Sequence, residues 1–225
     1  FINPVTGRIH PDTWQILSTG RVSLNEPNLQ QIPARSELGK KMRECFVEDE
    51  GYSIVGGDYS GCELRIIAQG SKDELWIETF LNNKDLHGEI ASKLFNIDIK
   101  DVKKYTDFKP DITYRDITKT INFGLAYRMS EYKLASTADI SVEKARQIIL
   151  DYFKAVPAVK SFLEALGQYG VDNGFIRTYR PYRRVRWFEG ADEPDFKREG
   201  EIKRASMNTP IQGTNADLVK LALIK

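Results

Sequence analysis

The sequence has few of the residues that build disulfide frameworks and thiolate metal sites. Its 225 residues include only two cysteines and two histidines. Cys45 and Cys62 show neither a metal-ligand spacing nor a disulfide pattern. A reduced, intracellular setting is therefore the simpler interpretation.

Long apolar runs, internal repeats and an excess of one charge are also absent. No stretch reaches the roughly 20 apolar residues that a membrane helix needs, so we expect no membrane partner. The net charge of +1 neither supports nor excludes a nucleic-acid partner, because such binding depends on local patches. A hydrophobic content of 41% and a charged content of 29% are ordinary for a soluble globular protein.

Charge is nevertheless uneven along the chain. Five arginines and three aromatic residues alternate in one short segment, and an acidic run follows it. The segment contains Arg177, Tyr179, Arg180, Tyr182, Arg183, Arg184, Arg186 and Trp187. Arginines mixed with aromatics suit a strand of phosphates and exposed bases, but a hairpin with a charged, solvated face fits equally well.

Cations and aromatics recur every fourth residue near the middle of the chain. The series is Arg115, Lys119, Phe123 and Tyr127. A second, apolar series lies two positions out of phase and consists of Ile117, Ile121 and Leu125. On a helix, residues four apart share a face, and two positions turn the helix by roughly 200°. The apolar series can then face a core and leave the mixed series for a ligand with phosphates and a flat base. The alternative is a solvated face with two incidental aromatics.

Four segments, in one order, resemble the motifs of the family A DNA polymerases, the DNA polymerase I type. Asp58–Arg65 resembles motif A, and Arg115–Tyr127 resembles motif B, the nucleotide-binding helix of the fingers. Thr19–Ser23 with Pro27–Pro33 resembles the primer–template segment, and Asn208–Asp217 resembles the palm helix that follows the fingers. The resemblance covers nearly the whole chain.

The resemblance implies an α+β fold, a partial right-hand palm with an antiparallel sheet and a mainly helical fingers insertion. We expect palm and motif A in residues 1–80, the fingers with the motif B helix in 81–200, and a return to the palm in 201–225. Tyr52–Gly57 is predicted to be a buried strand that ends at Asp58. One helix is predicted to begin near Glu63 and another to open at 85–87 and run through Phe95. Further helices are predicted over 142–153, after Pro157 to about Tyr169, and after roughly Gly200.

Motif C, which carries the family's second catalytic carboxylate, is missing from the sequence. The chain begins at Phe1 without an initiator Met and stops at Lys225. We therefore expect an internal segment of a longer polymerase that is inactive alone. The alternative is a non-catalytic fragment or split half that binds DNA and nucleotide and needs a C-terminal palm polypeptide as partner.

The resemblance implies template-directed extension of a primer 3′-hydroxyl from deoxynucleoside triphosphates, with two Mg²⁺ ions. Asp58 is expected to bind metal together with the Tyr59 backbone carbonyl, although an Asp in this position can also cap a helix. Arg115 and Lys119 are expected to hold the triphosphate. Lys119 would also protonate the leaving pyrophosphate, and Tyr127 would move as the site opens and closes.

The other expected nucleotide contacts are His87, Glu63 and Phe123. His87 would lie near the phosphates; the alternative is a histidine with a purely structural role. Glu63 would block a ribose 2′-hydroxyl; the alternative is an ordinary acidic residue in the first turn of a helix. The Phe123 ring would lie near the sugar.

The duplex is expected to meet polar residues that test pair geometry in the minor groove. These are Arg21, Asn28, Gln30, Arg204, Asn208 and Gln212. The implied partners are primer–template DNA and deoxynucleotides in the cytoplasm of a bacterium or a phage-infected cell. The sequence departs from the family pattern at four positions: Gln31, Gly61, Cys62 and Arg128.

Overall fold

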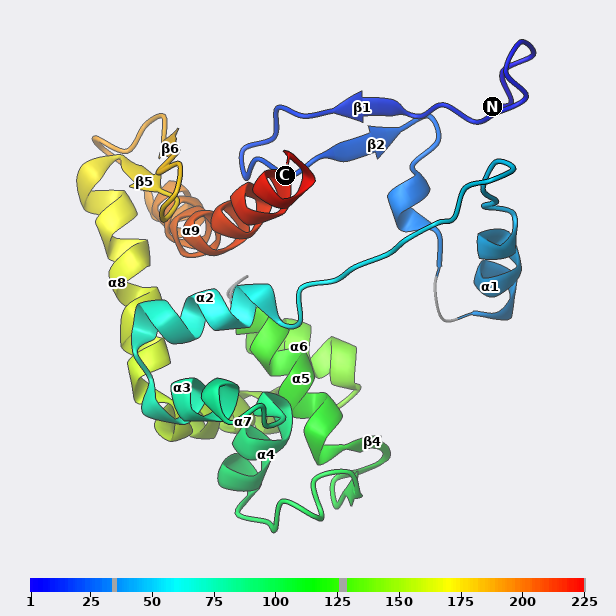
Figure 1. The fold of residues 1–225 in the computed structure, drawn as a ribbon. Helices are drawn as coiled ribbons and strands as arrows, with labels where there is room; N and C mark the ends of the chain where they lie inside the picture. Colours follow the sequence, from blue (N-terminus) through cyan, green and yellow to red (C-terminus); the bar gives the residue numbers. More distant parts are fainter. Residues whose placement is uncertain (34–35, 126–128, 225) are drawn as a thin grey trace. The chain divides into compact units, whose positions relative to one another are not determined.

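The computed structural model describes residues 1–33, 36–125 and 129–224. The chain divides into two compact units, Phe1–Ser60 and Gly61–Lys225. Helices dominate, and the strands form small antiparallel pairs (Figure 1). The α+β class is therefore confirmed, with three two-stranded ladders among the described residues.

The first unit is built from short elements. They are β1 (Asp12–Trp14), β2 (Ser23–Asn25), the 3₁₀ helix η1 (Leu29–Gln31) and α1 (Glu37–Glu44). β1 and β2 pair antiparallel, with Thr13 opposite Leu24. Among the unit's described residues only Gly20 and Gly39 are buried, so the unit encloses almost no apolar core.

The predicted buried strand over residues 52–57 is wrong. The segment forms no ladder, and Tyr52 and Val55 are 75% and 92% exposed. A strand is stable only when neighbouring strands satisfy its backbone and cover its apolar face. No described strand pairs with this segment, and its apolar composition alone does not create one.

The second unit is mainly helical (Figure 1). Its helices are α2 (Cys62–Ser71), α3 (Glu74–Leu81), α4 (Leu86–Phe95), α5 (Tyr114–Leu125), α6 (Glu131–Ala138), α7 (Val142–Ala155), α8 (Pro157–Asn173) and α9 (Phe196–Ile224). Its strands are β3 (Tyr105–Thr106) with β4 (Lys109–Thr113), and β5 (Phe175–Arg177) with β6 (Val185–Trp187). None of the described helices has both the length and the apolar content that a membrane crossing requires.

Local caps explain where the helices begin. The Ser141 hydroxyl accepts from the backbone N–H of Lys144 at 3.1 Å, which confirms the predicted start of α7. α9 begins at Phe196, earlier than predicted. Asp195 accepts from the backbone N–H of Arg198 at 2.7 Å and starts the helix upstream of its apolar residues.

One apolar core joins the helices of the second unit. Its fully buried members include Ile67, Trp76, Ile90, Ile117, Leu134, Tyr152, Val159 and Ile211. α8 and α9 pack closely within this unit. A Cβ added at Gly170 would lie only 1.7 Å from the Ser206 hydroxyl oxygen, so this close approach requires glycine. A small satellite core of Ile176, Phe188 and Ile202 holds the β5–β6 hairpin onto α9.

Candidate functional site

The face of α5 that carries cations and aromatics is turned away from the core. Ile117 and Ile121 are buried, as predicted from their spacing. Arg115 and Lys119 are half-buried, and Phe123 is 43% exposed. The amphipathic arrangement of this helix is therefore confirmed. Tyr127, predicted at its C-terminal end, lies outside the described residues, as does Arg128.

α4 runs beside α5 and supplies a carboxylate to Arg115. Asp85, the N-cap of α4, accepts from Arg115 Nε at 2.5 Å and from Nη2 at 3.0 Å. Partial burial acts to raise the Asp85 pKa, but the hydrogen bonds and charge of Arg115 outweigh it, and the pKa falls below its ordinary value. The Asp85 hydrogen bond raises the pKa of Arg115. The pair is ionised and fixes the guanidinium through two contacts.

His87 lies in the first turn of α4, next to Phe123 of α5. Their ring centroids are 5.6 Å apart with a tilt of 45°. Burial lowers the pKa of His87 from 6.5 to about 4, and the charges of Arg115 and Lys119 add to this. Near neutral pH the imidazole is therefore uncharged and has one N–H donor and one acceptor nitrogen.

Asn122 connects His87 to the core. Its amide nitrogen lies 2.8 Å from His87 Nδ1, and its amide oxygen accepts from the Tyr152 hydroxyl of α7 at 2.5 Å. Asn122 and Tyr152 are both 0% exposed. Leaving a polar group unpaired in such a place costs about 1–3 kcal/mol, so this chain of hydrogen bonds is a strong constraint on side-chain orientation.

Glu63 lies in the first turn of α2, and Asn215 of α9 donates to its carboxylate at 3.4 Å. Gly61, one of the departures from the family pattern, precedes this helix with φ +60° and ψ 34°. Glycine adopts that left-handed conformation without strain, which gives Gly61 a structural role at the start of α2.

Asp58 and Tyr59 both belong to the first unit and are exposed. A carboxylate and a backbone carbonyl are oxygen donors of the kind that Mg²⁺ prefers. Within residues 1–33, 36–125 and 129–224, no group of three His, Cys, Asp or Glu side chains comes close enough to hold a metal ion. Any metal site at Asp58 therefore has fewer than three such side chains among these residues.

Of the three candidate DNA-binding residues of the first unit, Asn28 and Gln30 lie at η1, and Arg21 lies just before β2. Asn28 caps η1 by accepting from the Gln30 backbone N–H at 3.1 Å. The Gln30 amide donates to the Val22 carbonyl at 3.3 Å, and Arg21 is exposed. These hydrogen bonds order the segment from β2 to η1.

The other three candidates lie four residues apart on α9, so they share one side of the helix. Arg204 is exposed, Asn208 is half-buried and Gln212 is buried. The Asn208 amide oxygen is buried and has no hydrogen-bond partner in the part of the chain that the structure describes. The exposure of these three side chains thus decreases along α9 from Arg204 to Gln212.

Two arginines of the basic segment make structural hydrogen bonds within the protein. Arg184 donates to Asp217 at 2.8 Å and to the Gly213 carbonyl at 3.1 Å. Arg186 donates to Thr209 at 3.0 Å. Both contacts tie the β5–β6 hairpin to α9. Asp217 also accepts from Thr178, which makes this carboxylate part of the hairpin anchor.

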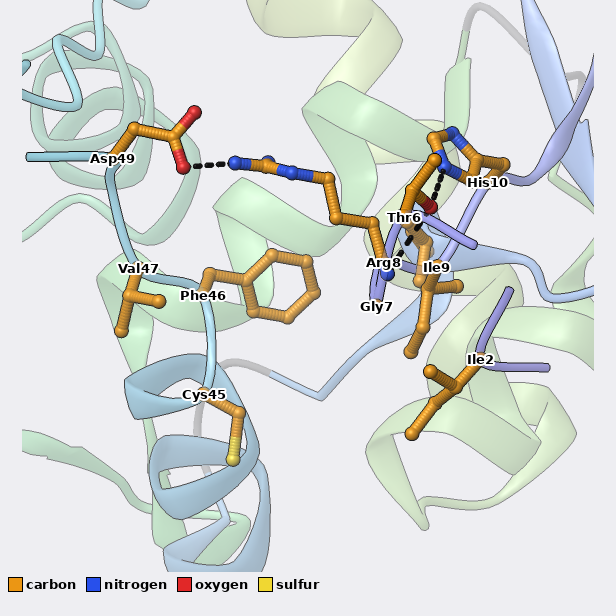
Figure 2. A pocket seen from close by; sticks show the side chains of 11 residues that line it. Ile2, Thr6, Gly7, Arg8, Ile9, His10, Cys45, Phe46, Val47 and Asp49 are labelled. Atoms are coloured by element: carbon orange, nitrogen blue, oxygen red, sulfur yellow. Dashed lines mark hydrogen bonds and ion pairs between the residues drawn. The ribbon is translucent and has the colours of Figure 1, made fainter. Parts of the chain in front are cut away.

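The first unit also contains an open hollow with a cavity volume of about 660 Å³. Figure 2 shows Arg8 reaching Asp49 across it and Thr6 bonded to His10, with Phe46 and Val47 on the wall. The Thr6–His10 distance is 2.7 Å. No residue predicted to bind substrate lines this hollow.

The structure thus brings His87, Arg115 and Phe123 into one cluster with Lys119. Three residues that contact this cluster or support it from the core were not predicted from the sequence as site residues: Asp85, Asn122 and Tyr152. Asp85 and Tyr152 are 30 residues from their partners along the chain, so no local pattern reveals the contacts. A signal did exist for Asn122, because an amide beside the buried Ile121 requires a partner in the core.

Known proteins resemble the chain over its full length. The model for DNA polymerase family A matches residues 1–225. DNA polymerase I of Caldicellulosiruptor bescii is 39% identical over 225 residues, which is 100% of this chain and 25% of that protein. The thermostable DNA polymerase I of Thermus aquaticus is 37% identical over 226 residues, or 100% and 26% of the two chains.

A solved structure shows the same fold. It is the POL domain of Pol1 from M. smegmatis in complex with DNA primer-template and dNTP, with a TM-score of 0.83 and 35% identity. The match covers 99% of this chain and 38% of that one. The chain spans about a quarter of the length of the two curated relatives. With a family match over every residue, a shared fold and close sequence relatives, the chain belongs to DNA polymerase family A.

Proposed function

We propose that this chain carries the nucleotide-selecting helices and part of the primer–template surface of a DNA polymerase. The observation that carries the proposal is the cluster on α4 and α5, where His87, Arg115, Lys119 and Phe123 gather beside one another. Family membership, and the solved structure of a relative in complex with DNA primer-template and dNTP, support a template-directed reaction.

Each member of the cluster has chemistry suited to a deoxynucleoside triphosphate. Lys119 supplies a mobile ammonium that contacts phosphate oxygens and gives a proton to the leaving pyrophosphate. Asp85 holds Nε and Nη2 of Arg115, and Nη1, which lies 4.0 Å from Asp116, is the nitrogen that would contact a phosphate. Neutral His87 donates one hydrogen bond, and the exposed Phe123 ring packs on the sugar. Tyr127 remains part of this proposal at the end of the helix.

Two-metal phosphoryl transfer remains part of the proposal. Asp58 and the Tyr59 carbonyl would hold Mg²⁺, which neutralises phosphate charge when it is bound. A second carboxylate would come from a polypeptide other than residues 1–225. The bare, apolar segment over 52–57 and the nearly coreless first unit support this view, because both expose surface that further palm strands would cover.

The proposed organisation follows from these roles. Residues 1–80 would form part of the palm with motif A, 81–200 the fingers and 201–225 a return to the palm. The proposed DNA contacts are Arg21, Asn28 and Gln30 in the first unit, and Arg204, Asn208 and Gln212 in the second.

The test replaces the matching segment of the Caldicellulosiruptor bescii polymerase with this chain. We expect this chimera to extend a primer in the order dictated by the template, and the 225-residue chain alone to bind a deoxynucleoside triphosphate without extending. A folded chimera that binds duplex but shows no template-directed extension contradicts the proposal. So does extension by the purified chain alone.

A change at Glu63 tests the proposed sugar selection. Glu63→Ala in the chimera removes the side chain proposed to exclude a 2′-hydroxyl, so ribonucleotide incorporation should rise by about a hundredfold relative to deoxynucleotide. A buried steric clash costs about 1–3 kcal/mol, which corresponds to about 5- to 150-fold. The measurement is the ratio of kcat/KM values for the two sugars. Glu74→Ala, in the first turn of α3, is the control and should leave this ratio unchanged.

A further inference from the structure

A buried series of hydrogen bonds lies behind His87. Three helices contribute to it: Tyr152 from α7, Asn122 from α5 and His87 from α4. Its inner two members are fully buried, and its outer member lies in the proposed nucleotide cluster. These hydrogen bonds therefore link the core directly to the proposed nucleotide site.

The Tyr152 hydroxyl determines which way the Asn122 amide faces. Burial raises the pKa of Tyr152 well above its ordinary value of 10.0, so the hydroxyl keeps its proton. Its acceptor in the described part of the chain is the Asn122 oxygen. A reversed amide would leave the buried O–H without an acceptor, which is costly. The Asn122 nitrogen is thus the atom that faces His87.

The amide in turn determines the state of the imidazole. Asn122 Nδ2 is a donor, so His87 Nδ1 must accept and cannot carry a hydrogen. The hydrogen of the neutral ring is then on Nε2. Protonation of the ring would set two N–H donors against each other. Charges from Asp85 on α4 and from Arg115, Asp116 and Lys119 on α5 also act on the ring, and Asp73 at the start of α3 acts on Tyr152.

We infer that Tyr152 and Asn122 are positioning residues that hold His87 as the neutral Nε2–H tautomer, a fixed hydrogen-bond donor for the incoming nucleotide. The tautomer follows from the geometry alone. Its use toward a triphosphate oxygen rests on the proposed function. A donor fixed in this way does not lose or gain its hydrogen across the physiological pH range, unlike an ordinary histidine.

Nitrogen NMR of the histidine-labelled chain tests the inference without any polymerase assay. The sequence has two histidines, and His87→Gln assigns the signals. We expect His87 to show an unprotonated Nδ1 and a protonated Nε2 between about pH 5 and 8. A protonated Nδ1, or an even mixture of tautomers, would overturn the inference whether or not any variant folds.

Tyr152→Phe removes only the hydroxyl and frees the amide to turn. We expect the Nδ1–H tautomer to appear and the chimera to lose about tenfold in kcat/KM for nucleotide. Tyr132→Phe on α6 is the matched control, since Tyr132 is exposed. Unchanged His87 signals in folded Tyr152→Phe would overturn the positioning role. If the tautomer is as expected but nucleotide leaves the His87 signals unmoved, the proposed function fails and the positioning stands.

Discussion

Asp58→Ala is expected to abolish primer extension by the chimera, with a loss of at least about a thousandfold in kcat. A metal-bound carboxylate supports several kcal/mol of charge stabilisation in phosphoryl transfer, and each 1.36 kcal/mol is tenfold in rate. Duplex affinity should stay within about twofold, because the proposed DNA contacts lie elsewhere on the chain. The measurements are single-turnover extension and duplex binding by anisotropy.

Asp12→Ala provides the control for this change. Asp12 is another exposed carboxylate of the first unit, at the start of β1. Its removal should leave extension at the parent rate. Near-normal turnover in Asp58→Ala would remove Asp58 from the proposed metal site.

Lys119→Ala is expected to lower kcat/KM of the chimera by about a thousandfold. Loss of a general acid alone costs about 10²–10⁴ in rate, and a charged hydrogen bond to phosphate is lost as well. The loss should be smaller for a nucleotide whose pyrophosphate carries electron-withdrawing substituents, since that leaving group needs less protonation. Steady-state kinetics with both nucleotides separates the two contributions.

Lys133→Ala on α6 is the matched control. Lys133 is an exposed lysine of the same unit, and its loss should change kcat/KM by less than about twofold. If Lys119→Ala is equally mild, the polar face of α5 is a solvated surface and the nucleotide binds elsewhere.

The helices of the second unit could be predicted because their signals are local. Ser141 caps α7 through a residue three positions away, and the spacing of Ile117 and Ile121 sets the buried side of α5. The strand predicted over residues 52–57 was wrong. The apolar composition of this segment indicates a strand, but a strand also depends on neighbouring strands, which no local pattern reveals.

The site could be predicted only in part for a similar reason. The four-residue spacing placed Arg115, Lys119 and Phe123 on one side of a helix, and the structure agrees. The contacts of Asp85 with Arg115 and of Tyr152 with Asn122 join residues 30 positions apart on different helices. Such pairs arise from packing, so the neutral state of His87 emerges only from the folded chain.

The Asp85–Arg115 pair has a consequence for how a nucleotide arrives. Two cations, Arg115 and Lys119, and two acids, Asp85 and Asp116, act on the neutral His87. Their charges cancel at a distance, so these four described residues together create no strong long-range field to draw in an anion. These residues then attract the nucleotide only when it comes into direct contact with them. Nucleotide affinity of the chain should change by less than about threefold as ionic strength rises from about 0.01 M to about 0.15 M, and a steeper fall would reveal a basic surface beyond these four residues.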